Sequence, residues 1–223
     1  MLDILIKNGQ VIDGTGNAWF RADLAIQGER IIQVRPNIEN QAKRVMDAAG
    51  LTIAPGFIDT HTHSDLRVLK YPEEDAKLMQ GITTAVIGQD GLSVAPLDEA
   101  NKQRMMLRLS GLLGTYLTEW PWNSMAEYLS AIDKLPPATN SMMLVPHGAI
   151  RAMVVGWENR PAYPAELQRM KRILTQALEE GGCGFSTGLI YPPGMYADRD
   201  EMVELGKVTA NYGGFFVVHM RNE

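Results

Sequence analysis

Hydrophobic and polar residues alternate in short runs along the first fifty residues of the chain. Residues 2–6 and residues 22–26 both place an apolar side chain at every second position, which predicts strands with one buried face. The polar segment Gln27–Arg30 then leads into a second apolar run, and this arrangement is typical of a hairpin. We therefore predict a small β module over residues 1–54.

From residue 55 the pattern changes, because short apolar runs now alternate with longer amphipathic segments. Such alternation indicates parallel βα units. The apolar runs predict five strands, at 57–63, 82–88, 141–148, 183–188 and 215–219. The amphipathic segments predict helices at 71–81, 98–117, 125–134, 165–180 and 198–212. Ser124 and Glu127 have the spacing of a capping box at the start of the third helix. The fold class is therefore α/β, with residues 55–223 as its larger domain.

Composition and charge exclude several classes of function. The chain has 223 residues, of which 45% are hydrophobic and 21% charged, as in an ordinary globular protein. The net charge of −5 and the pI of about 5.4 argue against partners such as nucleic acid or an anionic membrane surface. No apolar run approaches the roughly 20 residues that span a bilayer, and the N-terminus lacks the pattern of a signal peptide. The single cysteine, Cys183, allows no disulfide within the chain, so we expect a cytoplasmic protein.

The first strand of the larger domain runs into a pair of histidines. His61 and His63 are separated by one residue, so in an extended segment they project from the same face. Two imidazoles on one face suit a divalent metal ion. A bare pair of this kind is as often two polar residues that close a strand, but Asp59 and Asp65 flank these two.

Other polar residues follow the later strands in the same way. Asp90, His147, Ser186 and His219 each lie at or just after a predicted strand end. Parallel strands of a barrel bring such positions to one rim. Each histidine alone could be a hydrogen-bonded structural residue, whereas their recurrence at strand ends favours a metal site.

The segment from Pro55 to His63 closely resembles the first barrel strand of the amidohydrolase superfamily. Later segments resemble the N-acyl-D-amino-acid deacylases, or D-aminoacylases, so that the resemblance covers nearly the whole chain. The segments that carry it are residues 88–96, 146–151, 186–194 and 219–221. The resemblance implies a TIM-like (β/α)₈ barrel beside a small β-sandwich module. Such a barrel needs roughly 250 residues, so we expect a partial, truncated barrel of about five βα units that leaves edges open to self-association.

The resemblance also assigns roles to individual residues. It implies that His61, His63 and His219 bind metal, and that Asp90 stands where the family has a cysteine ligand. We expect Asp90 and His219 to bind the same ion, and we expect His147 to be structural rather than a ligand. The resemblance implies that Tyr191 and Arg221 bind substrate, with Arg221 facing a substrate carboxylate or a neighbouring acid. The alternative for Tyr191 is an aromatic side chain that packs within its loop.

The implied reaction is hydrolysis of the amide bond of a small-molecule N-acyl-D-amino acid. One or two zinc ions would lower the pKa of a bound water to about 7 and polarise the amide carbonyl. The general base implied by the family is an aspartate beyond residue 223, so no catalytic residue is assigned within the chain. Two alternatives stay open, a hydrolase of cyclic amides or isoaspartyl peptides and a non-catalytic truncated product. The absence of a lysine in the right strand-end setting argues against relatives that use a carbamylated lysine.

Overall fold

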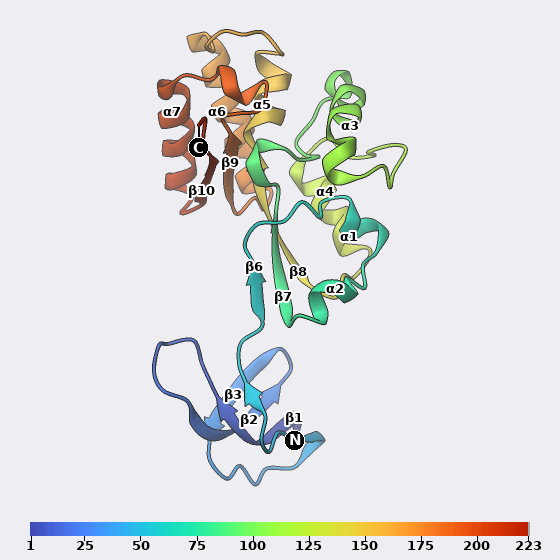
Figure 1. Ribbon diagram of the computed structural model, residues 1–223, viewed down its shortest axis with the longest axis vertical. Coiled ribbons are helices and arrows are strands. Elements are labelled where there is room, and N and C mark those ends of the chain that lie inside the picture. The colour runs from blue at the N-terminus through green and yellow to red at the C-terminus, as the bar shows by residue number, and fades with distance from the viewer. Residues whose placement is uncertain (223) are drawn as a thin grey trace. The chain divides into compact units, whose positions relative to one another are not determined.

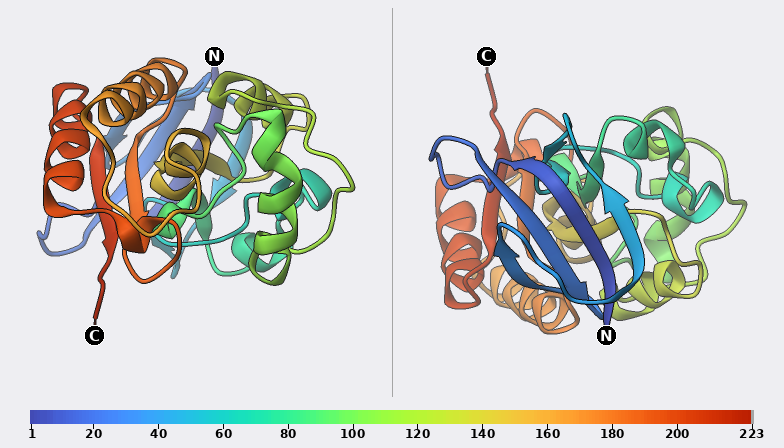
Figure 2. Two further views of the ribbon diagram at one scale, coloured as in Figure 1. Left: turned by 90° about the horizontal axis from the view of Figure 1, so that it is seen from above. Right: turned by 90° about the horizontal axis from the view of Figure 1, so that it is seen from below.

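The computed structural model describes residues 1–222 and contains two compact units, residues 1–56 and the residues from 57 onward. The first unit is a five-stranded sheet in which β1 pairs with β2 and β4, and β2 pairs with β3 (Figure 2). Its strands are β1 (Leu2–Val11), β2 (Phe20–Gln27), β3 (Arg30–Arg35), β4 (Ala42–Asp47) and β5 (Thr52–Ile53). β1, β2 and β3 are antiparallel neighbours, whereas β4 and β5 run parallel to β1.

The second unit is built on a sheet of five parallel strands in the order β10-β9-β8-β7-β6. The strands are β6 (Phe57–Asp59), β7 (Ile82–Ile87), β8 (Asn140–Pro146), β9 (Gly184–Gly188) and β10 (Phe215–His219). The spatial order follows the chain order, as in one side of a (β/α)₈ barrel. This curled parallel sheet confirms the predicted α/β class and the partial barrel.

Helices connect consecutive strands of this sheet (Figure 1). They are α1 (Arg67–Lys70), α2 (Asp75–Leu78), α3 (Glu99–Leu113), α4 (Met125–Asp133), α5 (His147–Val154), α6 (Pro164–Glu179) and α7 (Arg199–Asn211), with the 3₁₀ turns η1 (Gln89–Gly91) and η2 (Gly194–Tyr196). α6 and α7 lie side by side (Figure 2), and α7 also contacts β9 and β10. α4 begins with the predicted capping box, because the Ser124 hydroxyl accepts from the Glu127 N–H and the Glu127 carboxylate accepts from the Ser124 N–H.

The core of the second unit lies between the sheet and these helices. Met143 and Val145 on β8 and Phe185 on β9 are almost fully buried. On the helices, Met170 and Leu174 are completely buried one turn apart. The apolar periodicity of residues 165–180 therefore predicts the correct helix face.

The sequence prediction of one helix over residues 71–81 is wrong. The structure has two single-turn helices, α1 and α2, with Pro72 and Glu74 between them. Glu74 has a left-handed backbone, with φ of 39°, which no regular right-handed helix contains. Its buried carboxylate accepts from the Thr139 hydroxyl and pairs with Lys77 at 2.9 Å. The tertiary contact with Thr139 thus overrides the local helical pattern.

Edge strands of the second sheet expose apolar side chains. Phe57 and Ile58 on β6, and Phe215 and Phe216 on β10, are each at least 44% exposed. Open edges of this kind favour pairing with another chain or segment, and self-association stays a prediction. Within residues 1–222, no helix is long and apolar enough to cross a bilayer.

Candidate metal centre

Three imidazoles converge on the carboxylate of Asp90. The Nε2 atoms of His61 and His63 lie 3.3 Å and 3.2 Å from Asp90 Oδ2, and Nδ1 of His219 lies 3.7 Å from Asp90 Oδ1. His61 and His63 follow β6, Asp90 follows β7, and His219 is the last residue of β10, so the four residues lie at or just after the ends of three parallel strands. The structure therefore brings together all four residues that the sequence analysis selected as metal ligands.

The two neighbouring histidines reach this position from a loop rather than from a strand. β6 ends at Asp59, two residues before His61, so the expected strand alternation does not hold at His61 and His63. The Asp59 carboxylate accepts from the His61 N–H at 3.3 Å, and the Thr62 N–H donates to the Val86 carbonyl at 3.4 Å. These contacts hold the loop so that both rings still face Asp90, with their centroids 5.5 Å apart.

The donor set fits a divalent metal ion. One ligand atom each from His61, His63 and Asp90 lies within 4.8 Å of the other two. Imidazole nitrogen and carboxylate oxygen are both zinc ligands. The Asp90 side chain is only 9% exposed, whereas that of His61 is 52% exposed. The cluster is therefore buried on the side of the Asp90 carboxylate and open on the side of His61. This arrangement can hold a cation and leave room for a further ligand.

The Asp90 carboxylate is presented by a tight turn, η1, directly after β7. Asp90 has a left-handed backbone, with φ of 57°. Gly88 also has positive φ, and a Cβ atom there would lie 2.3 Å from the Leu144 carbonyl oxygen, so only glycine fits. The Gln89 side chain donates to the carbonyls of Thr60 at 2.9 Å and Val86 at 3.0 Å. The turn is therefore fixed between the β6 loop and the end of β7.

Asp65, which flanks the histidines in sequence, is completely buried below the same turn. Its carboxylate accepts from the Gly88 N–H at 3.2 Å and from the Ser93 hydroxyl. Burial raises the pKa of this carboxyl group, although the hydrogen bond from Ser93 opposes that effect. Asp65 thus supports the turn and does not face the open side of the cluster.

A cavity of about 300 Å³ lies beside His63 and Asp90. Its other lining residues are Leu92, Arg108, Leu109, Leu112 and Tyr191. Tyr191 is the residue of this lining that the sequence resemblance assigns to substrate binding, and its ring packs edge to face against His219 with centroids 5.0 Å apart. Arg108 and the three leucines are lining residues that the sequence did not predict.

Arg108 is a partly buried cation that forms no ion pair within residues 1–222. Its guanidinium lies 5.3 Å from the Trp157 ring centroid, and Arg104 lies 4.2 Å from the same ring. Burial, with the nearby charge of Arg104, lowers the pKa of Arg108. Nothing in the spacing of residues 98–117 singles out this arginine, because its place beside the cavity depends on how α3 packs.

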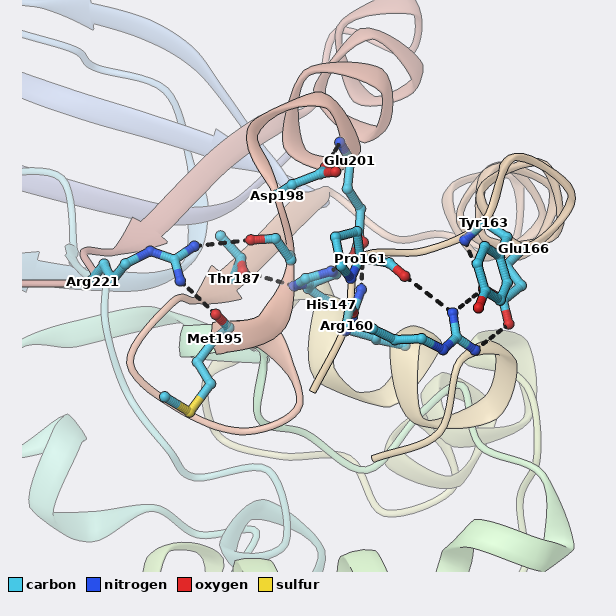
Figure 3. A network of polar contacts seen from close by, with 12 residues as sticks. His147, Arg160, Pro161, Tyr163, Glu166, Thr187, Met195, Asp198, Glu201 and Arg221 are labelled. Atoms are coloured by element: carbon cyan, nitrogen blue, oxygen red, sulfur yellow. Dashed lines mark hydrogen bonds and ion pairs between the residues drawn. The ribbon is translucent and has the colours of Figure 1, made fainter. Parts of the chain in front are cut away.

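Arg221 binds backbone carbonyls in the structure. Its guanidinium donates to the carbonyl oxygens of Met195 and, at 3.0 Å, Ala197 (Figure 3). It therefore ties the end of β10 to the loop that contains η2. The expected role of Arg221 in binding a substrate carboxylate stays a prediction.

His147 belongs to a buried polar network that includes Thr187 and Glu201 (Figure 3). Its Nδ1 lies 2.8 Å from the Thr187 hydroxyl and its Nε2 lies 2.7 Å from the Glu201 carboxylate. Glu201 also pairs with the fully buried Arg151. Since both ring nitrogens of His147 are engaged, the structure supports the expectation that it is structural. Cys183 is partly buried and directly precedes β9, so it lies at the start of the strand, whereas the proposed metal ligands lie at or after strand ends.

Comparison with known proteins connects this geometry to a family. The family model described as the amidohydrolase family matches residues 44–211. The chain is 37% identical to a D-aminoacylase of Alcaligenes xylosoxydans xylosoxydans over 99% of its own length and 45% of the relative's. It is 39% identical to an N-acyl-D-glutamate deacylase of the same organism, over 100% of the chain and 44% of the relative.

A solved structure agrees with both sequence comparisons. The N-acyl-D-glutamate deacylase from Bordetella bronchiseptica, crystallised with zinc and a phosphonate inhibitor, superposes with a TM-score of 0.89 at 36% identity. The superposition covers 100% of this chain and 46% of that one. The chain thus spans about half the length of the relatives it matches. With the family model covering most of its residues, the chain belongs to the amidohydrolase family.

Proposed function

We propose that the protein carrying this chain hydrolyses the amide bond of N-acyl-D-amino acids in a metal-dependent reaction that yields a carboxylate and a D-amino acid. The observation that carries the proposal is the convergence of three imidazoles on Asp90 at the ends of parallel strands. The relatives named D-aminoacylase and N-acyl-D-glutamate deacylase support the choice of substrate class.

His61, His63, Asp90 and His219 would hold the metal, for which we propose zinc. When bound, zinc lowers the pKa of water to about 7 and polarises a carbonyl group. Three neutral imidazoles and one carboxylate leave the loaded site with a net positive charge. That charge favours the developing negative charge on the amide oxygen during attack.

The cavity beside His63 and Asp90 would receive the substrate. Leu92, Leu109 and Leu112 offer an apolar wall, whereas Arg108 and Tyr191 are polar residues of the lining. An N-acyl amino acid has the same mixture, because it combines an apolar chain with an ionised carboxylate. The side chains that line the cavity would therefore orient the substrate against the metal ligands.

Proton transfer needs a carboxylate that is not engaged as a ligand. Within residues 1–222, Asp90 is the one carboxylate that lines this cavity. In line with the resemblance to the D-aminoacylases, which implies an aspartate as general base, we propose that this residue lies in the remainder of the whole protein.

The test is an enantiomer-resolved hydrolysis assay on the whole protein. After removal of metal with a chelator and reloading with zinc, N-acetyl-D-methionine, N-acetyl-D-glutamate and their L-enantiomers are supplied in parallel. We expect release of the D-amino acid only from the loaded protein, with the L-enantiomers much slower. A folded, zinc-loaded protein that cleaves neither D-substrate but opens a hydantoin or dihydroorotate ring would replace the proposal with the cyclic-amide alternative.

A further inference from the structure

The side chain that holds the Asp90 turn most directly comes from a distant strand. Ser186 lies on β9 and is completely buried. Its hydroxyl accepts from the Gly91 N–H at 2.9 Å and donates to the Gly88 carbonyl. One hydroxyl group thus bonds to one backbone group on each side of Asp90, although Ser186 lies 95 residues from Gly91 in the chain.

This turn needs support from outside because its conformation is unfavourable for Asp90. A residue other than glycine in the left-handed region is costly and persists only where its surroundings fix it. Glycines also allow β9 to approach closely, since a Cβ atom at Gly188 would lie 2.4 Å from the Asp90 carbonyl oxygen. The backbone around Asp90 is therefore shaped to meet β9, where Ser186 makes the polar contact.

We propose that Ser186 is a positioning residue for the metal centre. By bridging Gly91 and Gly88, its hydroxyl fixes the direction in which the Asp90 carboxylate faces the three histidines. The proposal rests on the metal site proposed above, but it concerns the support of one ligand rather than the reaction. It gives a function to a serine that is not itself one of the proposed metal ligands.

Removing the hydroxyl should weaken metal binding without removing a ligand. In Ser186→Ala, the Gly91 N–H and the Gly88 carbonyl lose their shared partner, so the turn can relax toward an ordinary backbone conformation. Loss of a group that orients a metal ligand typically lowers metal affinity by about 10- to 100-fold. We expect a loss of that size for Ser186→Ala.

The experiment is a competition titration of the metal-free whole protein with Co²⁺ against a chelating dye. The visible absorption of bound Co²⁺ also reports the coordination geometry, so a reoriented Asp90 should change the spectrum. Thr209→Val is the matched control, because the Thr209 hydroxyl is also buried but bonds to the Leu205 carbonyl within α7. We expect the control to bind Co²⁺ within about twofold of the wild type. Equal affinity in Ser186→Ala and Thr209→Val would overturn the proposal.

Two further measurements keep the result decisive. Ser186→Thr retains the hydroxyl and should recover most of the affinity, whereas a folded Thr variant as weak as the Ala variant counts against the proposal. If Ser186→Ala does not fold, hydrogen exchange at the Gly91 amide of the metal-free wild type decides, since the bond to Ser186 requires protection there. An unprotected Gly91 amide would contradict the inference. Failure of the wild type to bind Co²⁺ would instead refute the metal site itself.

Discussion

Replacing Glu201 with glutamine should strongly destabilise the second unit. Arg151 is completely buried and Glu201 is 1% exposed, so neither charge is screened by water. Glutamine keeps the shape of Glu201 but leaves the Arg151 guanidinium buried without a counter-ion. Breaking a buried pair in this way costs about 3–5 kcal/mol. At about 2–4 °C per kcal/mol for a unit of this size, the midpoint of thermal unfolding should fall by roughly 6–20 °C.

The matched control is Glu204→Gln, one turn further along α7. Glu204 also pairs with two cations, Lys171 and Lys207, each at 2.7 Å, but the Glu204 side chain is 30% exposed. Its removal should therefore have a much smaller effect. Urea unfolding followed by the fluorescence of Trp120 and Trp122, both buried in the second unit, gives the two free energies of unfolding.

The pH dependence checks the same reasoning. Burial raises the pKa of Glu201, but the hydrogen bond with His147 and the charge of Arg151 outweigh it and hold the pKa below its ordinary value of 4.5. A depressed carboxyl pKa contributes stability that is complete above the ordinary value and is lost as the pH falls through the folded-state value. The gap between wild type and Glu201→Gln should thus be widest above pH 4.5 and narrow in acid. Equal unfolding free energies for Glu201→Gln and Glu204→Gln at pH 7 would refute the account of this network.

Two predictions concern the cavity and the turn beside it. Arg108→Met should raise KM for N-acetyl-D-glutamate several-fold in the whole protein, because a partly buried cation that attracts the substrate carboxylate is lost. Arg104→Met removes the neighbouring cation on Trp157 and should have little effect on KM. Equal KM changes in the two variants would contradict this role of Arg108. Gly188→Ala should lower the zinc affinity measured by dye competition. The Cβ atom of the new alanine would lie 2.4 Å from the Asp90 carbonyl oxygen and must displace the turn. An unchanged affinity would show that the turn tolerates the displacement.

The sequence was sufficient to predict the residues at strand ends but not the contacts between distant elements. His61, His63, Asp90 and His219 follow apolar runs, and parallel strands bring such positions to one rim. The helix expected over 71–81 is interrupted at Glu74, whose carboxylate accepts a hydrogen bond from the Thr139 hydroxyl. Thr139 is 65 residues away in the chain, so local sequence patterns do not predict this contact. The hydrogen bonds of Ser186 with the Asp90 turn are equally beyond local prediction, since they depend on how β9 is placed relative to β7.

α5 shows a second limit of local patterns. The apolar run at 141–148 predicts a strand through Gly148, whereas β8 ends at Pro146 and α5 begins at His147. The helix is only eight residues long, which is too short for its periodicity to stand out against the preceding strand. Its charged residue Arg151 is buried because Glu201 lies opposite, a pairing that only the folded chain reveals.

The central claim is that His61, His63, Asp90 and His219 together bind a metal ion. Crystals of the zinc-loaded whole protein, measured on both sides of the zinc absorption edge, test this directly. We expect an anomalous peak within bonding distance of Nε2 of His61 and His63 and of the Asp90 carboxylate, with His219 completing the ligand set. A well-ordered map with no peak among these side chains, or with its zinc bound elsewhere on the chain, would contradict the account.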